Sequence, residues 1–545
     1  MSLSERVMSR VRELLGDDLL SEWDGGYGRV YVETVRERVP DVAKLMIGEF
    51  DARLVHINVI DLGVEGFKAV YSFGLDHVEK AFHLNVVARA PREDPKFPSL
   101  TPMTAQVEWA EREAMELLGV TFEGHPNPRR LFLPYEWPKP VESGWVPLKV
   151  EPSVPEAAIV PLGPYHPALI ESEYFRLKVD GEDIVDADLK MGFKHRGIMK
   201  LFEDRSYWRG VYLSERICGI CSHAHTTAFT RTVEMVAGIE VPERALYIRS
   251  LIAELERIHS HLLWLGVAGD LVGFKSLFMW VWREREHVQD ILEFLTGNRC
   301  HYAMNTVGGV RRDVSESQAK KALERLKEFE KGVKEVLDAV YDNPILRART
   351  EDIGVLKLPD AVDGGAVGPT ARASGWKIDV RADDPYAAYE DLSWEVVVDD
   401  GKDVWARVVV RVKEVLASAD MCRQCLEALT KVGGEIMAEV SEFGENEALG
   451  KVEAPRGELA YYVVSDGSIR PYAVRVRTPS YRNNALLPVM LKGYTIADAP
   501  IIIGSIDPCY ACTDRVILVD EKTGKETQIP FHEFMSGKFK GVSFR

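Results

Sequence analysis

Apolar residues recur at helical spacing in three long segments of the chain. Most of them stand three or four positions apart, which places them on one face of a helix. Pro242 and Glu243 precede the first segment and suit the start of a helix. The apolar positions are Leu246, Ile248, Leu251, Ile252, Leu255, Ile258 and Leu262; Ala319, Leu323, Leu326, Phe329, Val333 and Val336; and Val408, Val412, Val415 and Ala419. From about residue 159 we therefore predict a mainly helical domain with strands at its margins, and irregular structure in the Pro-, Gly- and Tyr-rich stretch after Ala454.

The first 137 residues follow a different pattern. An amphipathic helix is expected at the N-terminus, strands at residues 53–60 and 67–72, and a second helix at residues 106–118. Residues 138–158 contain five prolines, which favours an extended linker. The predicted fold class is α+β: a small N-terminal α/β domain of residues 1–137, followed by a large, mainly α-helical domain with peripheral strands.

Charge and apolar content narrow the classes of partner. The formal net charge of the 545 residues is −17, which argues against nucleic acid or an anionic lipid surface as the main partner. The most apolar region, residues 262–282, is interrupted by Asp270 and Lys275, so it is predicted to be buried helix rather than a membrane span. Charged residues recur through Asp18, so no signal peptide is expected. We expect the chain on the cytoplasmic side of a membrane, attached through other subunits.

Six of the seven cysteines form three Cys-x-x-Cys pairs. The pairs are Cys218 with Cys221, Cys422 with Cys425, and Cys509 with Cys512, and the seventh cysteine is Cys300. In a large chain such pairs indicate metal binding or redox chemistry. If the first and last pairs converge, they form a four-thiolate site, which suits zinc, an iron–sulfur centre or nickel. Small zinc modules usually bring their pairs closer in sequence, but a structural zinc site stays open at this point.

The middle pair lies on the apolar stripe of a predicted helix. Cys422 follows Val415 and Ala419 on that stripe, and Cys425 precedes Leu429. Buried cysteine commonly behaves as a small apolar residue. We therefore expect these two cysteines and Cys300 to pack in the core, with a metal site or a disulfide as the alternative.

Two segments of the sequence resemble the signature motifs of nickel–iron hydrogenase large subunits. They are Arg-x-Cys-Gly-x-Cys-x-x-x-His, which ends at His225, and Asp-Pro-Cys-x-x-Cys-x-x-Arg, which begins at Asp507. The resemblance implies that all four sulfurs bind nickel. It also implies that Cys221 and Cys512 bridge to an iron that carries carbon monoxide and cyanide, while Cys218 and Cys509 bind nickel alone.

Further motifs resemble the subgroup related to respiratory complex I. They are Gly163-Pro-Tyr-His-Pro167, Val179-Asp-Gly-Glu182, His195-Arg-Gly-Ile198, Glu254-Leu-Glu-Arg-Ile-His-Ser-His-Leu-Leu263, Thr296-Gly-Asn-Arg299 and Gly308-Gly-Val-Arg-Arg-Asp313. Residues 1–137 resemble the 30 kDa-type subunit of complex I. The residues that carry this resemblance are Trp109, Glu111, Glu113 and the segment from Phe122 to Pro126. This fused layout is similar to that of formate hydrogenlyase large subunits and of archaeal hydrogen-evolving assemblies.

The resemblance implies roles for five further functional groups. Cys509 would be the first proton acceptor, because metal coordination keeps a thiolate deprotonated. Glu171 matches the family's gate glutamate, with a surface or helix-capping glutamate as the alternative. Arg456 would face the metal pair and donate to cyanide, unless it forms an ordinary ion pair. Asp507 would orient Arg456 or the nearby backbone, and His225 would donate to a cysteine sulfur or be a buried structural histidine.

Two positions depart from the pattern of many hydrogenases. Met199 and Arg515 stand where others hold a third, magnesium-type ion, so that site is expected to be absent or rebuilt. The hydrogenase domain is predicted to span residues 159–515. The tail, residues 516–545, matches the segment that the family removes after nickel insertion, so we expect a peptide cleaved by a maturation endopeptidase, with a permanent C-terminal hairpin as the alternative.

The implied function is reversible reduction of protons to H2. With Cys300, Cys422 and Cys425 structural, no cysteines remain for an iron–sulfur cluster in this chain. The resemblance therefore implies a small subunit with a proximal 4Fe-4S cluster, a polyferredoxin subunit, membrane ion-translocating subunits, and formate or carbon monoxide dehydrogenase as donor. The alternatives are a quinone-reducing complex I-type subunit, which generally lacks the four cysteines, and a zinc-stabilised scaffold without catalysis.

Overall fold

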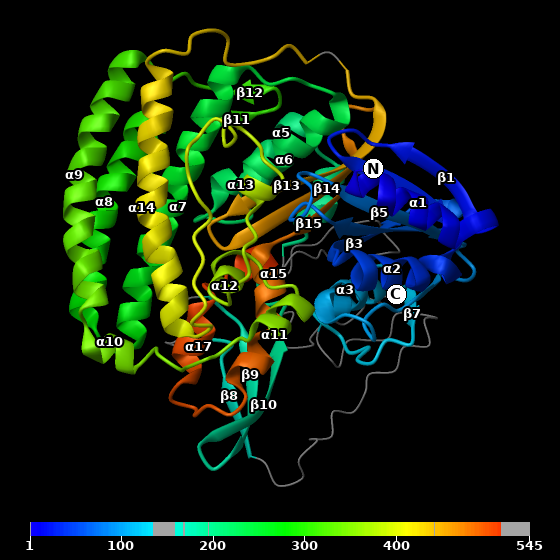
Figure 1. Ribbon diagram of the computed structural model, residues 1–545, viewed down its shortest axis with the longest axis horizontal. Coiled ribbons are helices and arrows are strands. Elements are labelled where there is room, and N and C mark those ends of the chain that lie inside the picture. The colour runs from blue at the N-terminus through cyan, green and yellow to red at the C-terminus, as the bar shows by residue number, and fades with distance from the viewer. Residues whose placement is uncertain are drawn as a thin grey trace, which may run out of the picture. The chain divides into compact units, whose positions relative to one another are not determined.

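The computed structural model describes residues 2–133, 158–166, 169, 171–194, 196–440 and 442–513. It divides into two compact units (Figure 1). The first unit comprises Met1–Asp180 and Asp188–Leu201, and the second comprises Gly181–Ala187 and Phe202–Cys512. The expected linker up to residue 157, Arg515 and the expected maturation peptide lie outside the described residues.

The first unit is built on a five-stranded sheet. Its strands follow the order β1-β2-β5-β4-β3, with β2 and β5 parallel and the other neighbours antiparallel. Three helices contribute to the core that this sheet forms. The strands are β1 (Leu19–Asp24), β2 (Arg29–Thr34), β3 (Arg53–Asp61), β4 (Phe67–Gly74) and β5 (His83–Ala90), and the helices are α1 (Leu3–Leu15), α2 (Val39–Phe50) and α3 (Glu108–Leu118). The α+β prediction for this region is confirmed.

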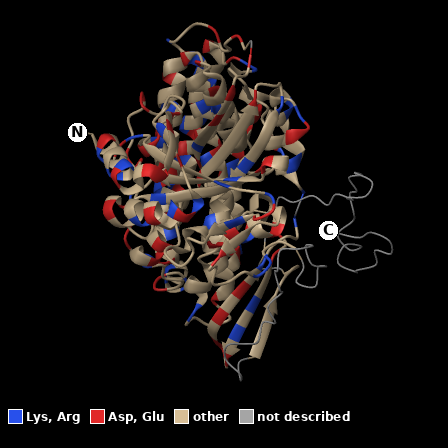
Figure 2. Ribbon diagram, turned by 90° about the vertical axis from the view of Figure 1, so that its right-hand side faces the viewer, with Lys and Arg blue, Asp and Glu red and all other residues tan. Residues whose placement is uncertain are grey.

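Strands also lie between residues 158 and 190, at the start of the predicted helical domain. A small sheet has the order β10-β9-β8, from β8 (Ala158–Leu162), β9 (Tyr174–Asp180) and β10 (Asp183–Lys190). Acidic and basic side chains are interspersed along β9 and β10 (Figure 2). These strands agree with the prediction of strands at the margins of the helical domain, and β9 alternates buried with half-buried residues, as a strand with one covered face does.

Four long helices lie side by side in the second unit (Figure 1). They are α7 (Glu243–Leu271), α8 (Lys275–Thr296), α9 (Glu316–Tyr341) and α14 (Val404–Leu429). Pro242 is the N-cap of α7, as its position predicted. The apolar stripes fall inside α7, α9 and α14, so the helical prediction is confirmed. Gly273, which has a positive φ, lies in the short connection between α7 and α8. No described helix is long and apolar enough to cross a membrane.

A three-stranded antiparallel sheet follows the helices. It consists of β13 (Glu445–Ala454), β14 (Gly457–Asp466) and β15 (Pro471–Arg477), and α6 (Ser222–Ala237) packs against β13 and β14. The expectation of irregular structure after Ala454 was wrong. Eight of the first nine residues of β14 are buried, so both faces are covered and the alternation that marks a half-exposed strand is lost.

Short elements connect these parts of the second unit. They are α5 (Tyr207–Glu215), β11 (Asn305–Thr306), β12 (Gly309–Val310), α10 (Pro344–Ala348), α11 (Leu358–Asp363), α12 (Gly368–Arg372), α13 (Val380–Asp383), α15 (Pro479–Asn484), α16 (Leu487–Leu491), α17 (Ala499–Ser505) and α18 (Tyr510–Thr513). The turn between β13 and β14 presses against the start of α12. A Cβ on Gly368 would lie 2.4 Å from both the carbonyl oxygen of Arg456 and Cα of Gly457. Only glycine permits this approach.

We predict that Gly368→Ala destabilises the chain by more than Gly375→Ala. Both glycines have a left-handed φ, +64° and +84°, so both changes cost about 1 kcal/mol of backbone strain. Only position 368 adds a clash with backbone, worth a further ~1–3 kcal/mol, because the nearest contact at position 375 is 3.7 Å away. Thermal unfolding of the full chain, followed by circular dichroism, measures the difference. Equal midpoints for the two variants would contradict the prediction.

The carboxyl group of Glu111 in α3 lies in the interior of the first unit. It is fully buried and accepts hydrogen bonds from Oγ of Ser99 at 2.5 Å, N of Leu100 at 2.7 Å and Oγ1 of Thr101 at 2.8 Å. Burial raises its pKa from 4.5 to about 7. The folded state therefore holds a proton that the unfolded chain has already released. The stability contributed by the neutral carboxyl is present below pH 4.5 and is lost as the pH rises to about 7, by up to roughly 3 kcal/mol.

Glu111→Gln removes this titration while keeping the size of the side chain. As the pH rises from 5 to 8, we expect the amides of β3–β5 in the wild type to lose protection against hydrogen exchange relative to the same amides in the variant. Comparing variant and wild type at each pH cancels the intrinsic dependence of exchange on pH. A difference that stays constant over this range would show that the carboxyl does not titrate there.

Candidate metal centre

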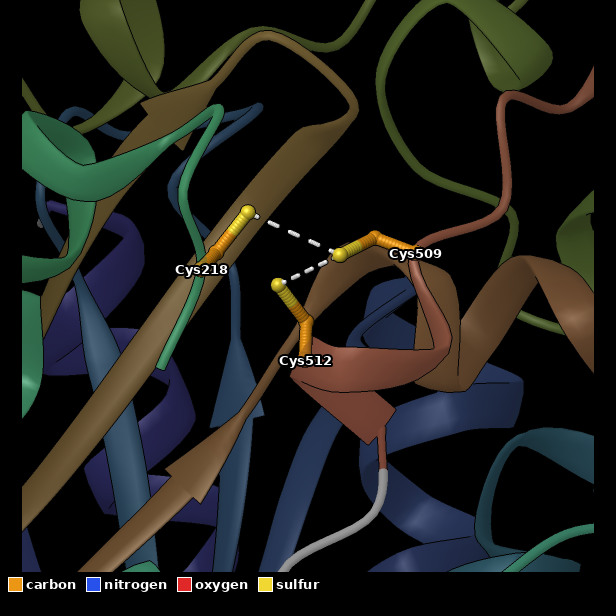
Figure 3. Close-up of side chains that lie close together, drawn as sticks. All are labelled: Cys218, Cys509 and Cys512. Carbon is orange, nitrogen blue, oxygen red and sulfur yellow. Dashed lines mark hydrogen bonds between the residues drawn. The ribbon is translucent and has the colours of Figure 1, made fainter. Parts of the chain in front are cut away.

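The first and last cysteine pairs meet inside the second unit. Cys218 and Cys221 lie on the connection between α5 and α6, and Cys509 and Cys512 lie at the start of α18. Sγ of Cys218 is 3.6 Å from Sγ of Cys509, Sγ of Cys221 is 3.8 Å from Sγ of Cys512, and the two sulfurs of the last pair are 3.0 Å apart. Figure 3 shows three of these side chains pointing toward one another. All four are buried.

The two distances between the pairs fit a four-coordinate metal, whereas the 3.0 Å within the last pair is shorter than such a site requires. With a metal–thiolate bond of about 2.3 Å, neighbouring sulfurs of such a site lie roughly 3.3–3.8 Å apart. Cys218, Cys509 and Cys512 can offer ligand atoms to one ion, and so can Cys221, His225 and Cys512. The donor set is soft, as nickel, zinc or iron requires.

The four thiols cannot all ionise without a cation. Hydrogen bonds from Cys221, Cys509 and Cys512 lower the pKa of the Cys218 thiol well below its usual value. Hydrogen bonding to Cys218 raises the pKa of Cys221, and burial raises that of Cys512. One thiolate is thus stabilised at the expense of its neighbours. A metal ion removes this conflict because its charge neutralises several thiolates together.

The backbone around each pair is fixed by hydrogen bonds. Sγ of Cys218 accepts from the N–H groups of Ile220 and Cys221, both at 3.3 Å, and the N–H of Cys509 donates to Oγ of Ser480 at 2.9 Å. Glu256 of α7 accepts from the N–H groups of His223 at 2.7 Å and Ala224 at 3.0 Å, at the start of α6. Sequence reasoning missed Glu256, although a charged residue on a buried helix face is itself a signal of a special role.

Arg456 and Asp507 form a buried ion pair beside the cysteines. Nη2 of Arg456 donates to Oδ1 of Asp507 at 2.8 Å, and Nε donates to the Asp507 carbonyl at 2.7 Å. Asp507 has a φ of +54°, so a left-handed turn lets its side chain and carbonyl face the same guanidinium. Burial by itself would lower the pKa of Arg456. The negative charges of Asp507 and the cysteines have the larger effect, so the pKa of Arg456 is raised. An ordinary ion pair was the alternative role of Arg456 expected from the sequence, and this ion pair is present. The remaining nitrogen of the guanidinium, Nη1, lies 3.5 Å from Oγ of Ser260.

The turn that carries Arg456 is anchored from α7. Arg257 donates to the carbonyls of Glu453 at 2.6 Å and Ala454 at 3.1 Å, at the end of β13. Together with the tight contact at Gly368, this fixes the backbone on which Arg456 stands.

His225 contacts a cysteine sulfur from α6. Its Nε2 lies 3.5 Å from Sγ of Cys512, and its Nδ1 lies 2.8 Å from the hydroxyl of Tyr461. This distance to sulfur fits a hydrogen bond, and it would also fit a nitrogen and a sulfur that bind the same metal ion. Tyr461 was not among the residues that the sequence singled out, because nothing in the local pattern of a buried strand marks it.

Glu171 and Met199 belong to the first unit. Oε1 of Glu171 lies 3.7 Å from Nζ of Lys194, and its side chain is 21% exposed. Met199 is buried. The roles expected for both positions stay predictions.

The three remaining cysteines differ from one another. Cys422 and Cys425 are fully buried, and Sγ of Cys422 lies 3.9 Å from the carbonyl of Leu251. Burial raises the pKa of both thiols, so they stay protonated, as apolar core residues do. Cys300 is exposed and donates to the carbonyl of Gly219 at 2.7 Å. The expectation that Cys300 packs in the core was wrong, because it lies on the irregular connection after α8.

Three family models match the chain. Residues 271–444 and 436–515 match the 49 kDa subunit of the respiratory-chain NADH dehydrogenase, residues 32–151 match its 30 kDa subunit, and residues 196–266 match nickel-dependent hydrogenase. The nickel-dependent hydrogenase match contains the first cysteine pair, and the 49 kDa match contains the second.

Curated relatives agree with these matches. Formate hydrogenlyase subunit 5 of Escherichia coli is 39% identical over 81% of this chain and 80% of its own length. The alpha subunit of the membrane-bound hydrogenase of Pyrococcus furiosus is 40% identical over 66% of this chain and 88% of its own length. A fused C/D subunit of the NADH-quinone oxidoreductase of Aquifex aeolicus is 31% identical over 79% of this chain and 86% of its own length.

Of these three relatives, the formate hydrogenlyase and membrane-bound hydrogenase subunits are more similar to this chain than the NADH-quinone oxidoreductase subunit, and their names describe subunits of larger assemblies. The converging cysteine pairs agree with that side of the family. This chain therefore belongs to the family of nickel–iron hydrogenase large subunits related to respiratory complex I, and it is an oxidoreductase with a fused domain of the 30 kDa-subunit type.

Proposed function

We propose that this chain reduces protons to H2, reversibly, at a nickel–iron centre held by Cys218, Cys221, Cys509 and Cys512. One observation carries the proposal: four buried thiols from two distant segments converge, and the distances between the two pairs suit a single metal site. When bound, the centre supplies redox chemistry that joins protons and electrons, with carbon monoxide and cyanide on the iron. Cys221 and Cys512 would bridge to the iron, and Cys218 and Cys509 would bind nickel alone.

The side chains around the centre would control charge and protons. Sγ of Cys509 is the proposed proton acceptor, since a metal-bound thiolate is unprotonated but remains basic. Arg456 would stay charged and donate to cyanide, because Asp507 holds its guanidinium in one orientation. We propose Glu171 as the carboxylate that relays protons away from the site. His225 would donate its Nε2 proton to the sulfur of Cys512.

Electrons would arrive from partner subunits. Cys300, Cys422 and Cys425 belong to none of the potential metal-ligand groups found among the described residues. We propose a small subunit with a proximal 4Fe-4S cluster and a polyferredoxin subunit as electron carriers. The assembly would lie on the cytoplasmic side of a membrane through ion-translocating subunits and draw electrons from formate or carbon monoxide dehydrogenase.

The proposed domain boundaries follow the same resemblance. Residues 1–137 would form the 30 kDa-type domain, residues 138–158 the linker and residues 159–515 the hydrogenase domain. A maturation endopeptidase would remove residues 516–545 after nickel insertion. We propose that the magnesium-type site is absent or rebuilt, because Met199 and Arg515 are unsuitable ligands for a hard cation.

Infrared spectroscopy of the processed chain with its small subunit tests this function. Metal-bound carbon monoxide and cyanide should give sharp bands that have almost no other source in a protein. Cys512→Ser should abolish them together with bound nickel. Cys422→Ala is the matched control, because it changes a buried cysteine outside the site and should cost only about 1–2 kcal/mol of stability.

Each other outcome favours an alternative function. Zinc in place of nickel, without the infrared bands, would support the zinc-stabilised scaffold. A fully processed, nickel-supplied chain that holds no metal and reduces quinone would support the complex I-type subunit. Loss of the bands in Cys422→Ala as well would mean that the buried pair contributes to the centre.

Arg456→Lys should retain nickel but lower the rate of H2 evolution by roughly 10²-fold or more. Lysine keeps the charge but loses the planar donor group that Asp507 orients, and removal of one oriented donor typically costs about 10²–10³ in rate. Viologen-driven H2 evolution measures the rate, and the nickel content of the same sample controls for assembly. An unchanged rate would show that the guanidinium serves structure alone.

A further inference from the structure

We infer that Tyr461 is a positioning residue whose hydroxyl donates to Nδ1 of His225 and so holds the imidazole proton on Nε2, facing the sulfur of Cys512. The inference deepens the proposed function and rests on it, because it takes Cys512 to be a ligated thiolate. Tyr461 would thereby ensure that His225 is the donor in its hydrogen bond with the sulfur of Cys512.

Tyr461, His225 and Cys512 form a chain of two hydrogen bonds, here called the relay, and each comes from a different element of the second unit. Tyr461 lies on β14, His225 on α6 and Cys512 on α18. The hydroxyl-to-Nδ1 distance is 2.8 Å and the Nε2-to-sulfur distance is 3.5 Å. All three side chains are buried, with Tyr461 at 0% exposure. Water is therefore a poor substitute for either contact.

Aromatic packing fixes the ring of Tyr461. Phe202 meets it edge-on at 6.4 Å between ring centroids, and Phe229 meets it at 6.1 Å with planes at 64°. Phe202 and Phe229 in turn stack on each other at 5.0 Å. The hydroxyl is thus held toward His225 by contacts that a phenylalanine at position 461 would keep.

The direction of each hydrogen bond follows from proton counting. A neutral imidazole has one nitrogen that donates and one that accepts. A metal-bound thiolate carries no proton, so it can only accept, and Nε2 of His225 must donate to it. Nδ1 must then accept, and the hydroxyl of Tyr461 is the donor placed to satisfy it. Without that hydroxyl, the proton can move to Nδ1, and a lone pair of Nε2 would then face the sulfur.

The hydrogen bond has an electronic consequence at the site. An N–H donor stabilises negative charge on a thiolate sulfur and weakens its donation to the metal. Loss of the donor makes the sulfur more electron-rich. The carbon monoxide band of the iron should then move to lower wavenumber, and the midpoint potential of the centre should become more negative.

Tyr461→Phe tests the inference with minimal disturbance, because only one oxygen atom is removed. Tyr462→Phe is the matched control: Tyr462 is the next residue of the same strand, is equally buried and points to the opposite face of the sheet. We expect Tyr461→Phe to retain nickel but shift the infrared bands, and Tyr462→Phe to leave them unchanged. The 15N spectrum of histidine-labelled enzyme should show the Nε2-protonated form of His225 in the wild type and a mixture in Tyr461→Phe.

A double-mutant cycle separates the relay from a packing role. In a His225→Phe background there is no imidazole to orient, so Tyr461→Phe should add no further band shift. A shift of the same size in both backgrounds would overturn the inference, and so would bands and a 15N pattern in Tyr461→Phe that match the wild type. Absence of the bands from the wild type would instead overturn the proposed function, and the inference with it.

Discussion

The second unit depends on a cluster of buried charges that must all be paired at once. Glu254 of α7 accepts from Arg381 at 3.1 Å, Tyr389 at 2.6 Å and Ser418 at 2.6 Å. Arg372 joins Glu414 at 2.8 Å and Glu453 at 2.8 Å. Burial would raise the pKa of Glu254, but Arg257 and Arg381 outweigh it and lower the value to about 2. Removing one member of such a cluster leaves an uncompensated buried charge, typically at a cost of about 3–5 kcal/mol. Because its members come from α7, α12, α13, α14 and β13, the cluster ties the helices to the sheet.

This cluster also sets the position of Arg456. Arg257 pairs with Glu254 and donates to the carbonyls of Glu453 and Ala454, two and three residues before Arg456. The backbone of that turn is therefore fixed from one side by charge and from the other by the glycine contact at the start of α12. A guanidinium held in this way needs no reorganisation when it meets a charged group, which is the condition for electrostatic stabilisation in a buried site.

The sequence predicts those parts whose cause is local. The stripes of α7, α9 and α14 follow from apolar spacing, and the start of α7 follows from Pro242. The strand β14 was not predicted, because burial on both faces erases its alternation. At the site, the cysteine motifs single out four thiols in advance. They could not identify Tyr461 or Glu256, whose importance comes from residues hundreds of positions or a whole helix away. The exposure of Cys300 likewise depends on how the connection after α8 runs.

The interactions that hold the second unit together, here called the framework, are distinct from those of the candidate metal site. The charge cluster, the helices and the three-stranded sheet are complete without any cation, whereas the four thiols are not, since their pKa values are driven apart by mutual contact. A framework of this kind is compatible with a family whose members include both hydrogenase subunits and NADH-quinone oxidoreductase subunits. A metal bound by these thiols would contribute free energy at a site that joins residues 291 positions apart in sequence. Ligation of Cys512 would favour the same proton position as the hydroxyl of Tyr461, because a bound thiolate can only accept from Nε2, whereas a free thiol can also donate to it. The proton arrangement around the sulfur would therefore depend both on the metal and on the scaffold that holds Tyr461 beside His225.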